Sequence, residues 1–234
     1  MAAAPAFRSK VFVVNSAGAL TVVGSEPAGA QPGDIFLVYA TWWSGTTVTV
    51  ANYPPEFNLV PGSPWLRSYQ GNSTYWLRRG ASAPSGWTWT FSGANTYNAL
   101  CIECYSGCDP GGAQNDFPWD VVAGIQTVQI ASKVNIGTAP AITTTIPNST
   151  VVQIIDWGIG NAGTAYTAPS GWNLREGGGN TDDTAVADLV QASPATVTPT
   201  VFGNAGTGTA DFFGLTLALK PPVPKTGILL LGAG

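Results

Sequence analysis

Apolar residues in this chain occur in short runs that alternate with polar residues or end at glycine and proline. The segment 87–91 places an aromatic residue at every second position with threonine between, which predicts a strand with one buried face. Longer apolar runs at 35–43 and 151–157 are typical of strands buried on both faces. Windows with helical spacing are broken by Gly or Pro within about two turns. The pattern therefore predicts an all-β chain.

The remaining strands follow from the same alternation, bounded by residues that favour turns. Asn15-Ser16-Ala17-Gly18 supplies a turn between the first two strands, and Gln31-Pro32-Gly33-Asp34 supplies a turn before the third. Further strands are expected at 11–14, 20–23, 46–50, 75–79, 99–105, 184–190, 198–202 and 212–219.

A short motif occurs twice and indicates an internal duplication. Pro54–Leu59 and Pro169–Leu174 lie 115 positions apart, and the same offset relates Pro32 to Pro147. Pro32 and Pro147 each precede an apolar run, and later strands correspond at slightly smaller offsets, as loop insertions would produce. We expect two degenerate halves, at about 32–107 and 147–220, within one antiparallel, jelly-roll-like β-sandwich domain of two sheets spanning 1–220.

Composition agrees with many short strands and restricts the function. The chain has 29 Gly and 18 Pro, and 44% of its residues are hydrophobic. Charged residues make up only 9%, against about 25% in an ordinary soluble domain. A surface with so few charges suits a protein that is packed in an assembly, because few ions would need desolvation.

Charge and hydropathy argue against two classes of partner. The net charge is −4, and Arg78-Arg79 is the only basic pair, so nucleic-acid binding is not expected. No apolar run approaches the about 20 residues that span a bilayer, so no membrane partner is expected. The N-terminus lacks the charged and apolar regions of a secretory signal.

The order of these motifs resembles a family of bacteriophage virion β-sandwich proteins. The resemblance covers roughly residues 10–220. It rests on the Pro-Gly-Asp turn into the strand at Pro32–Tyr39, on Pro169–Leu174 with its degenerate copy Pro54–Leu59, on Trp87–Gly93, and on Tyr105-Ser106-Gly107. It implies a virion component that decorates heads, belongs to the tail, or binds a receptor. The family supplies no catalytic residues.

Catalytic and metal chemistry find little support. The chain has no histidine, which removes His-based hydrolase arrangements and the commonest transition-metal ligand. Cys101, Cys104 and Cys108 lack a fourth ligand for a structural zinc site. Alternation sends Cys101 and Cys104 to opposite strand faces, which leaves free thiols, a disulfide involving Cys108, or metal as the alternatives.

Acidic residues offer two weak alternatives. Asp109, Asp116 and Asp120, or Asp182-Asp183, carry the oxygen ligands that Ca²⁺ prefers, but their spacing matches no calcium loop and solvated loops or turns are the favoured interpretation. Glu103 and Asp156 are the nearest approach to a glycosidase pair, but they belong to different strands of the repeat. We therefore expect no enzyme and no cofactor.

Aromatic residues raise the alternative of a carbohydrate-binding module. The row Trp87, Trp89 and Phe91 is expected to face the core. Trp65, Trp119 and Trp172 lie near prolines in predicted loops and are the candidates for exposed, ligand-facing rings.

The C-terminal segment 221–234 is expected to be an extended arm. Pro221-Pro222-Val223-Pro224 forms a stiff spacer. The aliphatic run Ile228, Leu229, Leu230 and Leu231 is predicted to dock on a neighbouring subunit. A sortase signal at 223–227 is a weaker alternative, because no longer apolar segment or basic tail follows it.

Together these observations predict a structural virion protein that assembles in the host cytoplasm. A capsid decoration or cement protein is favoured, acting as a homo-oligomer with the major capsid protein or tail proteins as partners. The alternative is a tail-associated module that binds a host surface glycan.

Overall fold

The computed structural model of the chain describes residues 2–15, 18–67, 70–82, 86–110, 117–122, 126–129, 136–157, 166–177, 184–198, 200–204 and 211–222. Strands and loops make up this described part, in which no helix is found. No membrane-spanning helix is therefore present among these residues.

The first half of the chain forms two antiparallel sheets. The larger has the order β1-β9-β3-β7-β5, with β6 also paired to β7. The smaller has the order β2-β8-β4. The strands are β1 (Ala6–Asn15), β2 (Thr21–Gly24), β3 (Ile35–Trp43), β4 (Val50–Asn52), β5 (Asn58–Leu59), β6 (Trp65–Arg67), β7 (Gln70–Arg78), β8 (Trp87–Phe91) and β9 (Tyr97–Ser106).

The second half repeats this strand order. Its larger sheet has the order β10-β20-β14-β17-β16, with β11 also paired to β20, and its smaller sheets are β12-β19-β15 and β13-β18. The strands are β10 (Trp119–Val122), β11 (Gln126–Gln129), β12 (Ile136–Ala139), β13 (Ile142–Thr143), β14 (Ser149–Trp157), β15 (Tyr166–Thr167), β16 (Asn173–Gly177), β17 (Thr184–Gln191), β18 (Thr196–Val197), β19 (Thr200–Asn204) and β20 (Asp211–Leu219).

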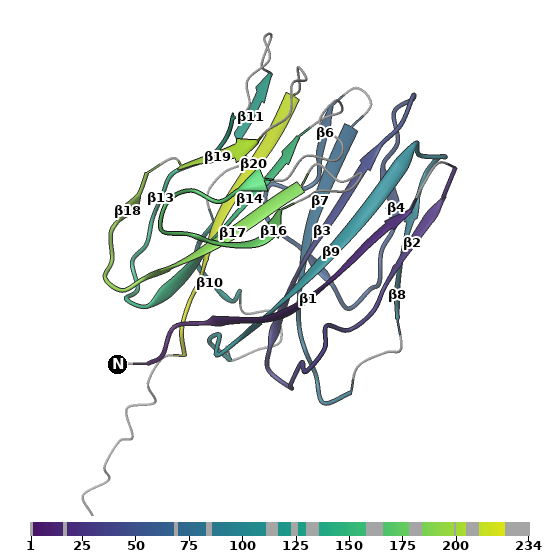
Figure 1. Cartoon of the computed structure of the whole chain (residues 1–234). Helices are drawn as coiled ribbons and strands as arrows, with labels where there is room; N and C mark the ends of the chain where they lie inside the picture. Colours follow the sequence, from purple (N-terminus) through teal and green to yellow (C-terminus); the bar gives the residue numbers. More distant parts are fainter. Residues whose placement is uncertain are drawn as a thin grey trace, which may run out of the picture.

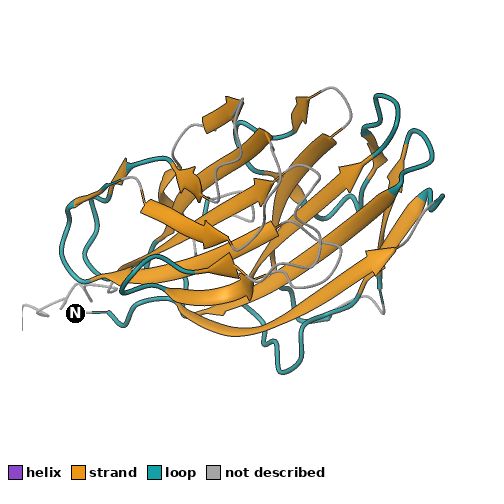
Figure 2. Cartoon of the chain, turned by 45° about the horizontal axis from the view of Figure 1, so that its top comes forward, coloured by secondary structure: helices purple, strands orange, loops and turns teal. Residues whose placement is uncertain are grey.

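The sheets stack in four layers (Figures 1 and 2). The β2-β8-β4 sheet covers one face of the first large sheet, and their common core includes Trp87, Trp89 and Phe36. The β12-β19-β15 and β13-β18 sheets cover the second large sheet. The two large sheets then pack on each other through a core that includes Ile35 and Leu215. The centre of the molecule is thus the contact between its halves.

Matching proline turns explain why equivalent strands begin at equivalent positions. In the turn 31–34, Asp34 N–H donates to the Gln31 carbonyl at 3.0 Å, and Gly33 has a φ of 92°. In the second half, Asn148 takes the equivalent position with a φ of 60°. A proline followed by a residue with positive φ is the pattern of a type II turn, which glycine and asparagine tolerate best.

The all-β, antiparallel sandwich architecture predicted from the alternation is confirmed. The expectation of a simple two-layer sandwich is wrong in one respect, because each half builds its own pair of layers. The jelly-roll connectivity and the division into one domain stay predictions. The arm residues Ile228, Leu229, Leu230 and Leu231 lie outside the described residues.

Candidate functional site

Two of the three tryptophans expected to be exposed are buried, and that expectation is wrong. Trp65 lies in β6 and Trp119 in β10, with exposed fractions of 9% and 8%. Both rings pack between the two large sheets, Trp65 against Phe213 and Trp119 against Trp76, with ring centroids 5.6 and 5.3 Å apart. A neighbouring proline marks the entry of each strand here and does not mark an exposed loop.

The third tryptophan, Trp172, is partly buried. Its backbone N–H donates to the Pro169 carbonyl at 3.0 Å, which closes the turn of the repeat motif, and Gly171 has a φ of 85°. The Trp172 ring packs on both small cores of the second half. Its position is that of Phe57 in the first half, which closes the equivalent turn and is buried.

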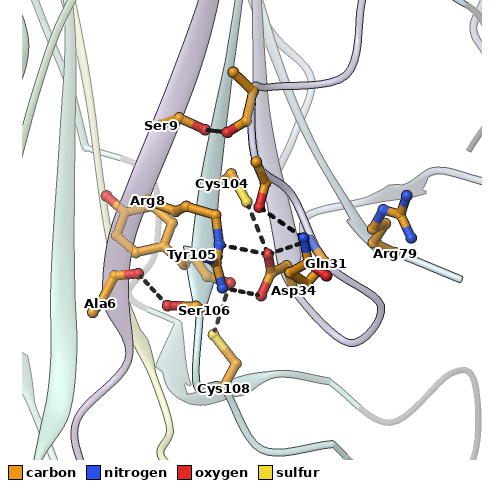
Figure 3. A network of polar contacts seen from close by, with 12 residues as sticks. Ala6, Arg8, Ser9, Gln31, Asp34, Arg79, Cys104, Tyr105, Ser106 and Cys108 are labelled. Carbon is orange, nitrogen blue, oxygen red and sulfur yellow. Dashed lines mark hydrogen bonds and ion pairs between the residues drawn. The ribbon is translucent and has the colours of Figure 1, made fainter.

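Cys104 belongs to a network centred on Asp34, and Cys108 lies near it (Figure 3). The Asp34 carboxylate accepts from Arg8 Nε at 2.8 Å and from Gln31 N–H at 2.8 Å, and the Cys104 thiol donates to it at 3.4 Å. Burial, and then the Asp34 charge, raise the pKa of the Cys104 thiol to about 12. This network joins β1, β9 and the 31–34 turn, so its role is structural.

All three thiols are free and buried, as one of the alternatives predicted. Cys101 packs in the core between the halves and Cys104 in the core of the first half, which confirms that they occupy opposite strand faces. Burial raises the pKa of Cys108, and Arg78 opposes this. In the described part of the chain, no group of three Cys, Asp or Glu residues is arranged to hold a metal ion.

The loop acids proposed for calcium have separate structural partners. Asp109 forms an ion pair with Lys220 at 2.9 Å. Asp120 accepts from Thr145 N–H at 2.6 Å and from Ile146 N–H at 3.0 Å, so it fixes the chain before the Pro147 turn. Asp116, Asp182 and Asp183 lie outside the described residues.

Glu103 is the centre of a polar cluster between the halves. It is fully buried and accepts a hydrogen bond from the Tyr105 hydroxyl at 3.0 Å. Burial raises the pKa of Glu103 to about 8; the Tyr105 hydrogen bond and Lys10 lower it, whereas Asp188 and Glu176 raise it.

One ion pair and one cation–π contact connect this cluster across the interface. Lys10 of β1 contacts Glu176 of β16 at 2.6 Å. Arg175 Nε and its terminal nitrogen donate to the Asp188 carboxylate at 2.6 and 2.9 Å, and the Arg175 guanidinium lies 4.6 Å from the Phe7 ring centroid. The cluster therefore ties β1 of the first half to β16 of the second half.

Glu103 and Asp156 are not arranged as a glycosidase pair. Asp156 pairs with Thr184 and Asp188 pairs with Val152 in the same ladder, so about 13 Å of β17 separates Asp156 from the Glu103 neighbourhood. Both acids are buried, with exposed fractions of 0% and 1%. A substrate could not reach either carboxylate.

An aromatic cleft of about 190 Å³ opens at the edge of the first half, between the small sheet and the β5–β7 edge of the large sheet. Three rings line it, those of Trp42, Tyr53 and Tyr75, together with the hydroxyl side chains of Thr49 and Ser73. Aliphatic side chains complete the lining: Val50, Leu59, Pro64 and Leu66.

The walls of the cleft are held by specific contacts. The Tyr53 and Tyr75 ring centroids lie 4.6 Å apart, and Trp42 Nε1–H donates to the Val48 carbonyl at 2.9 Å. Burial raises the pKa of Tyr75 to about 12, with the Ser73 hydrogen bond opposing and Tyr53 adding to the shift. The lining residues include no Asp, Glu, Lys or Arg.

The second half shows that the fold does not require these tyrosines. Leu59 pairs with Tyr75 in the first half, and the equivalent Leu174 pairs with Ala187 in the second. Tyr53 precedes the Pro54 motif, whereas Ala168 precedes the Pro169 motif. The second half, which has the same strand order, therefore carries alanine at both positions that tyrosine occupies in the first half. Comparison of the two motifs could have singled out Tyr53 from the sequence.

No family model, curated protein or solved structure matches this chain.

Proposed function

We propose that this protein is a non-enzymatic structural component of a bacteriophage particle, which coats or cements the capsid as a homo-oligomer. The observation that carries the proposal is the internal use of its charges. Each lysine and arginine side chain that the structure describes has a partner in the same chain: Arg8 with Asp34, Lys10 with Glu176, Arg78 with the Asp109 carbonyl, Arg79 with Glu26, Arg175 with Asp188, and Lys220 with Asp109.

A surface whose basic side chains are already paired within the chain favours assembly through apolar packing and hydrogen bonds between neutral groups. Several large apolar side chains are exposed, among them Leu20 at 52%, Val23 at 54% and Phe117 at 51%. Burial of apolar surface contributes about 25 cal/mol per Å². A contact of a few hundred Å² per subunit, repeated over a lattice, gains further from multivalency. Few ions would have to be desolvated in such a contact.

The location of the chain on purified particles tests this proposal. Antibody-gold labelling viewed by electron microscopy is expected to place label evenly over the head. Label confined to the tail tip would replace decoration with a tail-associated, receptor-binding role. Particles that carry no label would refute the virion role.

Truncation after Pro222 tests the predicted contribution of the C-terminal arm. Removal of residues 223–234 is expected to reduce particle binding or self-association by at least about tenfold, because it deletes the Ile228–Leu231 run. Co-sedimentation with particles and analytical ultracentrifugation measure the two effects. The truncation keeps β20, which ends at Leu219, and the Lys220–Asp109 ion pair, so the fold is expected to be retained. Unchanged assembly of the truncated chain would show that the arm does not dock.

A further inference from the structure

We propose that the aromatic cleft lined by Trp42, Tyr53, Tyr75 and Ser73 is a binding site for one neutral pyranose ring of a glycan. The inference is independent of the virion role, because it concerns the purified chain alone. Four features of the cleft carry it: its exposed apolar rim, its hydroxyl groups, its lack of charged side chains, and its size.

The rim provides an apolar surface for the face of a sugar ring. Tyr53 is 40% exposed and Leu66 is 42% exposed, although both side chains line the cleft. An exposed ring that is already fixed against Tyr75 loses little conformational freedom when a ligand covers it. The C–H face of a pyranose is apolar and flat enough to cover such a ring. Tyrosine also keeps a hydroxyl group at its edge, which suits an amphipathic ligand.

The interior of the cleft presents hydroxyl groups in place of charges. The side chains of Ser73 and Thr49 both line the cleft; Ser73 is 1% exposed, and the Thr49 hydroxyl donates to Ser92 at 3.3 Å. A hydroxyl group both donates and accepts hydrogen bonds, which matches the hydroxyl groups of a sugar. A wholly apolar ligand would remove water from these groups without replacing its hydrogen bonds. An anionic ligand would be desolvated without a cation among the lining residues.

The size of the cleft restricts the ligand to one ring. Its volume of about 190 Å³ lies below the roughly 300–1,000 Å³ of sites for drug-sized ligands. It corresponds to about six water molecules at roughly 30 Å³ each. A single pyranose fits this scale, and the rest of a glycan would extend past Tyr53 into solvent.

The cleft is rigid, because its parts belong to strands or are fixed to them. Trp42 is on β3, and Ser73 and Tyr75 are on β7 in the same sheet. The Trp42 ring lies against the backbone of Gly71, where an added Cβ would be 2.1 Å from the ring. The Val48 carbonyl accepts from the Trp42 indole, which links the floor of the cleft to the segment before β4. A preformed site of this kind does not need ordering on binding.

Titration of the full-length, ¹⁵N-labelled chain with methyl glycosides of glucose, galactose and mannose and with N-acetylglucosamine tests the proposal. At least one of these sugars is expected to bind with an about millimolar dissociation constant, since a ligand of this size reaches only modest affinity. The NMR shift changes are expected at the cleft and at the Trp42 indole. Methyl glucuronide, in which a carboxylate replaces the hydroxymethyl group of the glucoside, is expected to bind at least about tenfold more weakly than the neutral sugar.

Substitutions give a matched comparison. Tyr53→Ala is expected to weaken sugar binding by at least tenfold, and Tyr53→Phe by less, because it keeps the ring. Leu20→Ala removes a side chain of similar exposure outside the cleft and is expected to leave affinity unchanged. The proposal is overturned if no neutral sugar shifts the cleft resonances, if shifts map elsewhere, or if Tyr53→Ala binds as tightly as the unmodified chain. Tighter binding of a proline-rich peptide at the same resonances would also overturn it.

Discussion

Replacing Glu103 with glutamine is expected to raise the free energy of unfolding by about 3 kcal/mol at pH 7. Burial raises the pKa of Glu103 to about 8 in the folded chain, against 4.5 for an unperturbed glutamate. The folded state therefore binds this proton more tightly than the unfolded state. The resulting contribution to stability is complete below a pH of about 4.5 and is lost as the pH rises toward 8.

The amide of glutamine can replace the protonated carboxyl group in this position. Its oxygen can still accept from the Tyr105 hydroxyl, which donates to Glu103 at 3.0 Å. Glu103 also faces Tyr39, whose pKa is raised by burial and by the Glu103 charge. The charged groups around it are Asp188 and Glu176, which disfavour its ionisation, and Lys10, which favours it. Glutamine removes the repulsion without removing volume.

Urea unfolding between pH 5 and pH 8 measures this effect. The unmodified chain is expected to lose stability across this range, and the glutamine variant to lose much less. Glu56→Gln is the control, because Glu56 is exposed. The Glu56 carboxylate accepts a hydrogen bond from the Trp87 indole at 2.8 Å, and the glutamine amide oxygen can accept the same bond. The effect of Glu56→Gln should stay within about 0.5 kcal/mol. Parallel pH curves for the unmodified chain and Glu103→Gln would contradict the assignment of the proton to Glu103.

Replacing Gly71 with alanine is expected to lower the free energy of unfolding by about 3 kcal/mol, the upper range for added volume in a packed core. The new Cβ would lie 2.1 Å from Trp42 Cζ2 and 2.9 Å from Leu66 Cδ2. The indole cannot move freely, because its Nε1–H donates to the Val48 carbonyl and its ring packs on Phe91 at 5.5 Å between centroids.

A second glycine provides the control for this substitution. A Cβ at Gly45 would have no neighbour within 4 Å. Gly45→Ala is therefore expected to be neutral or slightly stabilising, since alanine restricts the unfolded chain. Denaturant unfolding of the two variants measures the difference. Equal stability would show that β3 and β7 can separate at this point, which would also make the floor of the cleft adaptable.

The strands with the clearest alternation were the ones that could be predicted. Trp87, Trp89 and Phe91 face the core while Thr88 is exposed, as the period of two requires. The apolar run Ile35–Trp43 is buried on both faces, as expected. In a two-layer sandwich one face of each sheet is solvated, so burial of this run on both faces requires further layers, which were not predicted. That consequence depends on how sheets stack, which alternation within one strand does not encode.

The candidate site depended on contacts between distant segments. Trp65 and Trp119 were expected to be exposed because each follows a proline. Their burial results from the second half covering the first. Tyr53 and Leu66 lie in separate short segments with no period of their own, and only the path of the chain around β5 brings them to one cleft. The residue before each repeat motif, Tyr53 in the first half and Ala168 in the second, is a difference in the sequence that distinguishes this edge.

The contact between the two large sheets is an interface between two halves of one chain. A fragment ending before β10 would present Leu37, Trp76 and the rest of that face to water. Such a fragment would associate only above some protein concentration. In the intact chain the complementary face is covalently attached, so its effective concentration is set by the connecting segment. Dilution, which dissociates a dimer of separate chains, therefore does not separate the two halves.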